Sequence, residues 1–181
     1  MAIADPVVMP LALELLACLD EEIAKVAHPP ARVGLRPGTV VDFLLSTTED
    51  ECCEGLAWVR PALFYPSSSV FPLQDEQPPT PYVASWAITL EMGAARCSPT
   101  PPETSIPSVA EWNEVVQRVM DDAAAMRRAI CCFIAADPIN RKRNVLPGQW
   151  QPLEVEGGCV GGTLAVTVRG PACDCVESGG S

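Results

Sequence analysis

The segment from 108 to 136 constrains the fold more than any other part of this sequence. Ser108 and Glu111 have the spacing of a capping box, in which both side chains bond the free amides of a helix's first turn. Apolar residues follow at alternating spacings of four and three, which places them along one side of a helix. They are Trp112, Val116, Val119, Ala123, Met126, Ile130 and Phe133. Asp137-Pro138 ends the pattern, so the chain must supply an apolar surface for a helix of about eight turns.

A strand predicted at 83–93 is the best candidate for that surface. Within "VASWAITLEMG", large apolar residues alternate with small or polar ones, as in a strand with one buried face. A coiled coil is the alternative, but about three heptads make only a short one. We therefore expect the helix to pack on the domain's own sheet. The residues that should meet are Trp112, Val119, Met126 and Ile130 from the helix and Trp86, Ile88 and Leu90 from the strand.

The remaining elements are expected in the order helix, strands, long loop, strand, helix, strands. A first helix is predicted at 10–27, with Pro10 in its first turn, followed by a proline- and glycine-rich turn region at 31–38. Further strands are predicted at 39–45, 56–64, 150–155 and 160–169, and Pro61 should mark an edge or a bulge. Helices covering an antiparallel or mixed sheet of four to five strands make an α+β fold. We expect one domain over 1–181, with two main helices and a flexible tail at about 170–181.

Two glycine pairs in "EGGCVGGTLAVTVRG" (156–170) resemble a phosphate-binding loop only superficially. A P-loop requires Gly-Lys-Ser/Thr at the start of a helix, and here Thr163 follows the second pair and begins an alternating, β-branched run. A metal loop would need more ligands than Cys159. The segment is therefore predicted to be a turn or bulge of closely packed backbone that leads into a strand.

Composition argues for a globular protein without a nucleic-acid-binding face. The 48% hydrophobic and 19% charged content fits a folded domain, and a net charge of −11 disfavours a basic groove. The densest basic cluster is "NRKRN" (140–144), which we expect to be a solvated loop with Arg141, Lys142 and Arg143 at its centre. Asp5 and Glu14 interrupt the apolar N-terminal run, so we expect neither a signal peptide nor a membrane partner.

The nine cysteines carry no zinc-type spacing. No Cys-x-x-Cys pair occurs, and the adjacent pairs 52/53 and 131/132 diverge from one another, so no metal site is predicted. Most of the thiols are expected to be buried and free, since disulfides would be expected only if the protein works outside the reducing cytosol. The exception we predict is one disulfide that uses Cys173 or Cys175.

Residues that could support catalysis are scattered. His28, the only histidine, lies before two prolines and has no orienting carboxylate in its neighbourhood. The acidic run 49–51 has no glycosidase or metal context, and Asp121 and Asp122 diverge around the helix axis. We therefore predict no catalytic, cofactor-binding or metal-binding residues, and a protein that is not an enzyme.

The loop predicted at 66–81 is the candidate interaction element. It is long and has no periodicity, and it contains three apolar residues, Val70, Phe71 and Leu73. Grouped exposed apolar residues mark binding surfaces, so we expect an oligomer or partner interface here. The alternative is that the loop folds back on its own domain in a small satellite cluster.

Four segments in this order resemble one known family. They are "EDECCEGLAWVRPALFYPSSSVFP", "WAITLEMGAARCSPTPP", "MDDAAAMRRAICC" and "PGQWQPLEVEGGCVGGTLAVTV", together covering roughly residues 49–168. The set is similar to the tail terminator (tail completion) type among the head-to-tail connector proteins of actinobacterial long-tailed phages. The N-terminal helix agrees with that family in kind only.

The resemblance implies a structural virion protein without catalytic residues, assembled in the host cytoplasm. By resemblance, an α/β subunit forms a hexameric ring that caps the tail tube and joins it to the stopper or connector at the head, and DNA passes through without specific binding. Another connector layer is the alternative, but the stopper is expected to be a small β-barrel and the adaptor mostly helical. A cysteine-rich metal-binding module or enzyme is the distant alternative.

Overall fold

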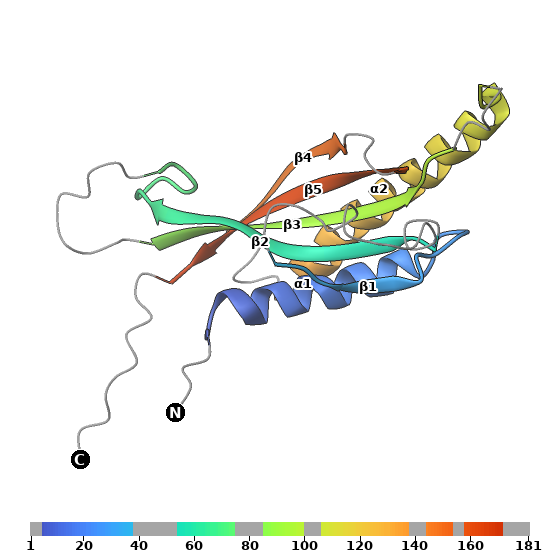
Figure 1. Ribbon diagram of the computed structural model, residues 1–181. Coiled ribbons are helices and arrows are strands. Elements are labelled where there is room, and N and C mark those ends of the chain that lie inside the picture. The colour runs from blue at the N-terminus through green and yellow to red at the C-terminus, as the bar shows by residue number, and fades with distance from the viewer. Residues whose placement is uncertain are drawn as a thin grey trace, which may run out of the picture.

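The computed structural model describes residues 5–37, 54–74, 85–99, 106–137, 144–153 and 158–171. They form an α+β fold with one five-stranded sheet and two helices packed on the same face of it (Figure 1). The elements are α1 (Val8–Ile23), β1 (Arg32–Leu35), β2 (Leu56–Ser67), β3 (Ser85–Cys97), α2 (Val109–Ala136), β4 (Val145–Pro152) and β5 (Cys159–Gly170). The predicted fold class is confirmed.

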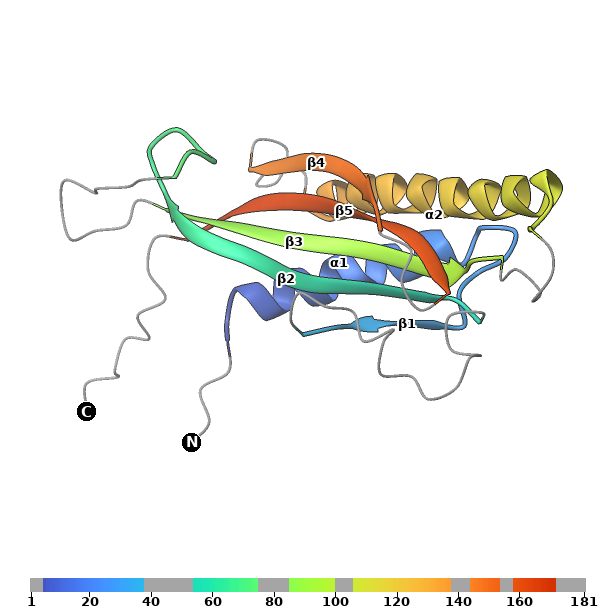
Figure 2. The same cartoon turned by 45° about the horizontal axis from the view of Figure 1, so that its top comes forward.

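The sheet is mixed, with the strand order β1-β2-β3-β5-β4. β1 pairs with β2 in parallel, and every other pair is antiparallel. The three long strands β2, β3 and β5 form the centre, and α1 and α2 run side by side across their shared face (Figure 2).

Four strands and the first helix differ from their predicted bounds. β3 continues to Cys97, past the predicted end at 93, and α1 ends at Ile23 rather than at 27. Residues 31–38 were expected to be a turn region, but Arg32–Leu35 is a strand. Four residues that include a glycine are too few and too irregular to predict a strand from the sequence. β4 begins at Val145 rather than near 150, and a shift in pairing between Pro147 and Trp150 interrupts its pattern. β2 continues to Ser67, past the predicted end at 64. The bulge expected at Pro61 is confirmed, because the pairing shifts between Pro61 and Leu63.

The core lies between the helices and the sheet face that carries the alternate residues of β3. Ile88 is 2% exposed, and Leu90 and Met92 are fully buried, as their alternation predicts. From α2 the buried residues include Val119, Met126, Ile130 and Phe133, and from α1 they include Ala12, Leu15, Leu19 and Ile23. The expected packing of this part of α2 on the sheet is confirmed.

Trp112 is not buried against the sheet, contrary to its predicted place in the core. Its side chain is 39% exposed, and none of residues 109–118 is buried. The cause is the position of α2, whose first turns lie beyond the end of the strands (Figure 1). The apolar side of the helix therefore continues past the surface that it packs on.

A buried ion pair joins α2 to the sheet where the helix leaves it. Arg96 on β3 donates two hydrogen bonds to the Asp122 carboxylate, Nε to Oδ2 at 2.8 Å and Nη2 to Oδ1 at 2.6 Å. The two side chains are only 8% and 3% exposed. Asp121 instead faces outward and accepts a hydrogen bond from Gln117, so the adjacent carboxylates diverge as expected.

The second glycine pair allows close packing of backbone and rings. A Cβ on Gly161 would lie 2.0 Å from the Ala94 carbonyl oxygen, and one on Gly162 would lie 2.2 Å from the Trp150 ring. Gly158 has a φ of +76°, the left-handed conformation of a turn residue. The predicted turn followed by a strand is confirmed.

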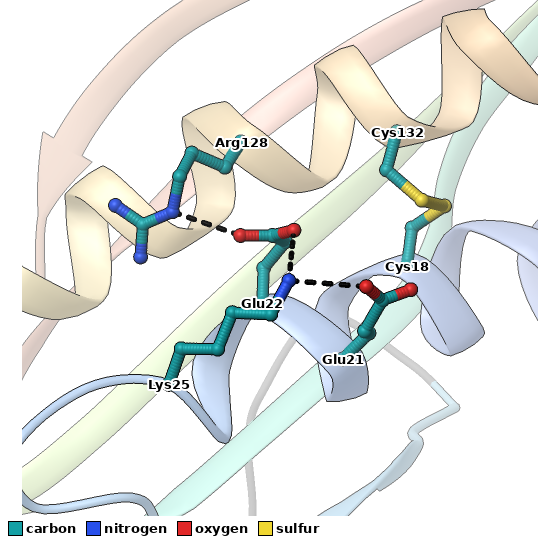
Figure 3. Close-up of polar contacts among 6 residues, drawn as sticks. All are labelled: Cys18, Glu21, Glu22, Lys25, Arg128 and Cys132. Atoms are coloured by element: carbon teal, nitrogen blue, oxygen red, sulfur yellow. Dashed lines mark hydrogen bonds and ion pairs between the residues drawn. A yellow bond between two sulfur atoms is a disulfide. The ribbon is translucent and has the colours of Figure 1, made fainter.

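The expectation of mostly free thiols is wrong for the cysteines that the structure describes. Cys18 on α1 and Cys132 on α2 form a disulfide with Cα atoms 5.7 Å apart (Figure 3). Cys97 and Cys159 also take part in disulfide bonds, and Cys131 is a free, exposed thiol. The sequence could not show this, because a separation of 114 residues is bridged only when the helices pack.

Around this disulfide the helices are also joined by charges. Arg128 on α2 donates a hydrogen bond to Glu22 on α1 at 2.8 Å, and Lys25 bonds Glu22 at 2.7 Å and Glu21 at 3.0 Å (Figure 3). The hydrogen bond from Lys25, followed by that from Arg128, lowers the pKa of Glu22.

Several predicted features lie outside the described residues. They are the strand at 39–45, the basic residues Arg141, Lys142 and Arg143, the cysteines Cys173 and Cys175, and nearly all of the tail at 170–181.

The core assignment predicts that Met126→Asp is strongly destabilising. Met126 is fully buried, so the new carboxylate would lose its hydration without gaining a partner, at a cost of about 3–5 kcal/mol in the free energy of unfolding. Met120→Asp is the matched control on the same helix, because Met120 is 42% exposed. Thermal unfolding should separate the two variants, and equal melting temperatures would contradict the assignment.

The α1–α2 disulfide is expected to add to stability. Closing a chain loop of 114 residues lowers the entropy of the unfolded state, by about 4–5 kcal/mol in the chain-entropy model. Cys132→Ser should therefore lower the melting temperature under non-reducing conditions, while Cys131→Ser, which removes only the free thiol, should not. Non-reducing peptide mapping that finds Cys18 and Cys132 as free thiols would refute the linkage.

Candidate interaction surfaces

The end of β2 and the turn after it carry exposed apolar side chains on both sides of the sheet, which we name the β2-tip patch. Phe64 lies on the helix side, because it pairs with Ile88, and Leu63 lies on the opposite side, because it pairs with Thr89. The patch consists of Leu63, Phe64, Val70 and Leu73, which are 57%, 59%, 61% and 60% exposed. Two of the three interface residues predicted from the sequence, Val70 and Leu73, belong to it. The third, Phe71, is half-buried between them.

The predicted loop begins as a compact turn rather than an irregular one. Ser67 bridges to Gln74, and the Ser68 amide donates to the Leu73 carbonyl at 2.8 Å. The Tyr65 hydroxyl donates to the Pro72 carbonyl at 2.9 Å. These bonds satisfy the backbone inside the turn, so Val70 and Leu73 are held outward on a well-defined surface.

Phe71 joins this turn to the end of β5. The Arg169 guanidinium lies 5.1 Å from the centre of the Phe71 ring, within the range of a cation–π contact. The tip thus contacts its own domain through Phe71, as the alternative interpretation of this loop expected, while its other apolar residues point away. Arg169 itself stays exposed at this end of the sheet.

Sequence reasoning missed Leu63 and Phe64. Both were assigned to a strand, where alternate residues are expected to be covered, and Phe64 pairs with the buried Ile88 on the helix side of the sheet. The prolines of this stretch could have indicated that its residues lie on an open edge. Pro61 and Pro66 flank this stretch, and β1 pairs only with Leu56 to Val59, so the described part of the chain leaves the rest of this edge open.

The second cluster, the α2 patch, lies on the overhanging start of α2 and on Ile106 just before it. Its residues are Ile106, Val109, Trp112, Val116 and Met120, which are 89%, 76%, 39%, 56% and 42% exposed. Trp112 and Val116 continue the side of the helix that is buried further along. A solvent-facing helix surface would normally be polar, so this one lacks its partner within the described residues.

The two patches lie at opposite ends of the molecule because α2 is displaced along the sheet. A helix of 28 residues and a strand of 13 residues both span about 42 Å. α2 extends beyond the sheet at one end, so the sheet extends beyond α2 at the other end, where β2 finishes (Figures 1 and 2). Phe64 lies on that uncovered helix-side surface.

The start of α2 is built to remain helical without support from the sheet. The predicted capping box is confirmed, with the Glu111 amide donating to the Ser108 hydroxyl and the Ser108 amide donating to the Glu111 carboxylate at 2.6 Å. The Ser108 side chain, followed by its backbone amide, lowers the pKa of Glu111 by hydrogen bonding. Arg118 further pairs with Glu114 one turn away.

The sheet face opposite the helices carries mostly small, uncharged side chains along β3 and β5. On β3 the residues of this face include Ala87, Thr89, Gly93 and Ala95, which alternate with the core residues. On β5 they include Gly161, Thr163, Ala165 and Thr167. Thr89 and Thr167 share a hydrogen bond of 3.0 Å, and Arg60 neutralises Glu91 at 2.7 Å. In the described parts of β3 and β5, the exposed cation on this face is Arg169, which pairs with Ala87. One such side chain does not make a basic groove.

Other kinds of site have less support in the described residues. His28 is exposed beyond the end of α1, and the described ranges contain no group of three His, Cys, Asp or Glu side chains that could hold a metal ion. Among the same residues, neither helix is both long and apolar enough to cross a bilayer. The two apolar patches remain the best candidate site.

Comparison with known proteins adds no assignment to this geometry. No protein-family model matches the chain, and no curated protein is significantly similar to it in sequence.

The capping box predicts that the start of α2 loses order in acid. The pKa of Glu111 is lowered in the folded helix, so its contribution is present above the ordinary value of 4.5 and is lost as the pH falls through the folded pKa. The Cα chemical shifts of residues 109–113 should therefore move towards coil values as the pH is lowered below 4.5. Glu111→Gln should abolish this titration and Glu114→Gln should leave it, whereas a pH-independent first turn in the wild type would contradict it.

Proposed function

We propose that this protein is a structural virion component of a long-tailed phage, a tail terminator. In this role, copies form a ring that closes the tail tube and joins it to the stopper or connector at the head. The observation that carries the proposal is the pair of unpartnered apolar patches at opposite ends of one subunit. Different patches on one subunit make a head-to-tail contact, and such contacts generate rings when the rotation closes.

The fold supports this layer of the connector over its neighbours. By the resemblance given above, a stopper would have little helix and an adaptor little sheet. This subunit combines a five-stranded sheet with helices of 16 and 28 residues. The oxidised cysteines also suit a particle that leaves the reducing cytosol, although assembly would take place in the host cytoplasm.

The proposal includes DNA that passes through the ring without being bound. Each copy carries a net charge of −11, which disfavours a basic wall along the channel. A channel binds DNA when its lysine and arginine side chains neutralise phosphates and release the counterions of the DNA. In an expected hexamer, acidic residues should therefore outnumber basic ones along the channel.

Assembly with purified tail tubes tests this function. We expect light scattering and negative-stain electron microscopy to show rings, either free or formed on tube ends, and capped tubes to join heads in vitro. A protein that remains a 19.3 kDa monomer, both alone and with tubes, would contradict the proposal. Tight, salt-sensitive binding of the rings to duplex DNA would contradict the account of the channel.

A further inference from the structure

We infer that the α2 patch of the free protein packs on the α2 patch of a second copy, so that two overhanging helix starts form an antiparallel, two-fold pair. The occupant of the patch is therefore the same segment of another chain. The inference concerns the protein before it assembles and does not rest on the proposed ring. Since that ring would use the same patch, the pair has to open before a ring can close.

The helical residues of the α2 patch form one continuous stripe. Val109, Trp112, Val116 and Met120 follow each other at spacings of three, four and four, which keeps them within about 80° of one another around the helix axis. The first three also begin the heptad-like spacing whose later members are buried against the sheet. The coiled coil that the sequence left as an alternative therefore remains open for the exposed start of α2, with a second copy as the other helix.

The offset between α2 and the sheet leaves room for that second helix. Residues 109–120 extend about 17 Å along the axis. Because Trp112 and Val116 continue the buried side of α2, this stretch faces the layer of the sheet where the strands have ended (Figure 1). A second copy, related by a two-fold axis, would place its own helix start in that layer, with Trp112 of each copy against Val116 of the other.

The charged side chains of this segment lie away from the stripe. Glu111, Glu114, Arg118 and Asp121 are each turned by about 140° or more from its middle, and Asn113, which borders the stripe, is uncharged. Two stripes can therefore meet without bringing like charges into contact. The repulsion that remains is between two net charges of −11, so the pair should tighten as salt screens it.

The exposed area suits a weak but specific pair. From their exposed fractions, the residues of the α2 patch present about 500 Å² of accessible surface, within the range of functional patches on monomers. Two such patches bury at most about 1,000 Å² together, which is the lower limit for a specific interface. The capping box keeps the segment helical before it pairs, so little ordering entropy opposes the contact. We therefore expect a dimer that exchanges readily with monomer.

Opposite charges at one position test this contact. Val116 is 56% exposed, so Val116→Asp and Val116→Lys should fold with unchanged melting temperatures. In sedimentation equilibrium, the mass of the wild type should rise with concentration from 19.3 kDa towards twice that value. Each variant alone should dimerise at least about tenfold more weakly, because the two-fold axis brings two like charges close together. Leu13→Asp is the control and should dimerise like the wild type, because Leu13 is 51% exposed on α1 outside the patch.

A mixture of the two variants gives the decisive result. Equal amounts should form a 1:1 heterodimer, because the opposite charges then face each other. Such a rescue is expected only if position 116 of one copy lies near position 116 of the other. A mixture that stays monomeric where the wild type dimerises would overturn the inference, and so would a Val116→Asp protein that dimerises as strongly as the wild type.

A photo-crosslinker in place of Trp112 provides a test without charged substitutions. In the free dimer, it should crosslink to peptides of the other copy that contain residues 113–120. Crosslinks only to segments outside α2 would overturn the inference even if the charged variants misfold.

The outcomes also separate this pair from the ring. A wild type that is monomeric at every concentration but forms rings on tail tubes would overturn the pair and leave the proposed function standing. A wild type that dimerises through α2 but never assembles on tubes would support the pair and remove the proposed function.

Discussion

The buried ion pair between Arg96 and Asp122 determines where the long helix sits, and most of the surface follows from that position. Removing one partner of such a pair leaves a charge in the interior and costs about 3–5 kcal/mol. Moving α2 by one turn, about 5.4 Å, would break both hydrogen bonds of the pair, whereas the apolar contacts of a helix can be remade at a new register. The pair therefore selects one register, although it adds little net stability compared with apolar packing.

The surroundings of this pair tie it to the rest of the chain. Gly55 has a φ of +81°, and a Cβ there would lie 2.7 Å from Nη1 of Arg96 and 3.0 Å from Cα of Pro30. The Ala31 amide also donates to the Glu54 carbonyl at 2.9 Å. The turn before β2 thus lies directly against the Arg96 side chain and the start of β1, so the edge strand and the helix register are fixed at one point.

The parts of the fold that follow from local pattern could be predicted, and those that depend on distant contacts could not. Ser108, Glu111 and the spacing up to Phe133 specify α2 and its buried side, because helix caps and periodicity are local properties. The same pattern placed Trp112 in the core, because periodicity says which side of a helix is apolar but not where the opposing sheet ends. The Cys18–Cys132 disulfide and the Arg96–Asp122 pair could not be predicted either, because each joins residues that are far apart in the sequence.

The candidate site was half predicted, and the missing half shows what sequence reasoning lacks. Val70 and Leu73 stood out because they are apolar residues in a segment without periodicity. Phe64 and Trp112 fit a regular pattern, and their exposure arises only from the offset between two layers. Exposed apolar residues inside regular elements are therefore hidden in the sequence, because the pattern that makes them apolar is the one that normally buries them.

The offset between α2 and the sheet also bears on how copies would stay apart before the proposed assembly. Each group of exposed apolar residues is small and is flanked by charges, while the net charge of −11 keeps free copies apart. A contact between such small groups would lie at the weak end of specific interfaces, so a single pair would dissociate readily. In the proposed ring every copy would make two such contacts, and a tube end that holds several copies together would raise their effective concentration. Small, separated patches on an acidic subunit thus favour assembly on a template over assembly in free solution.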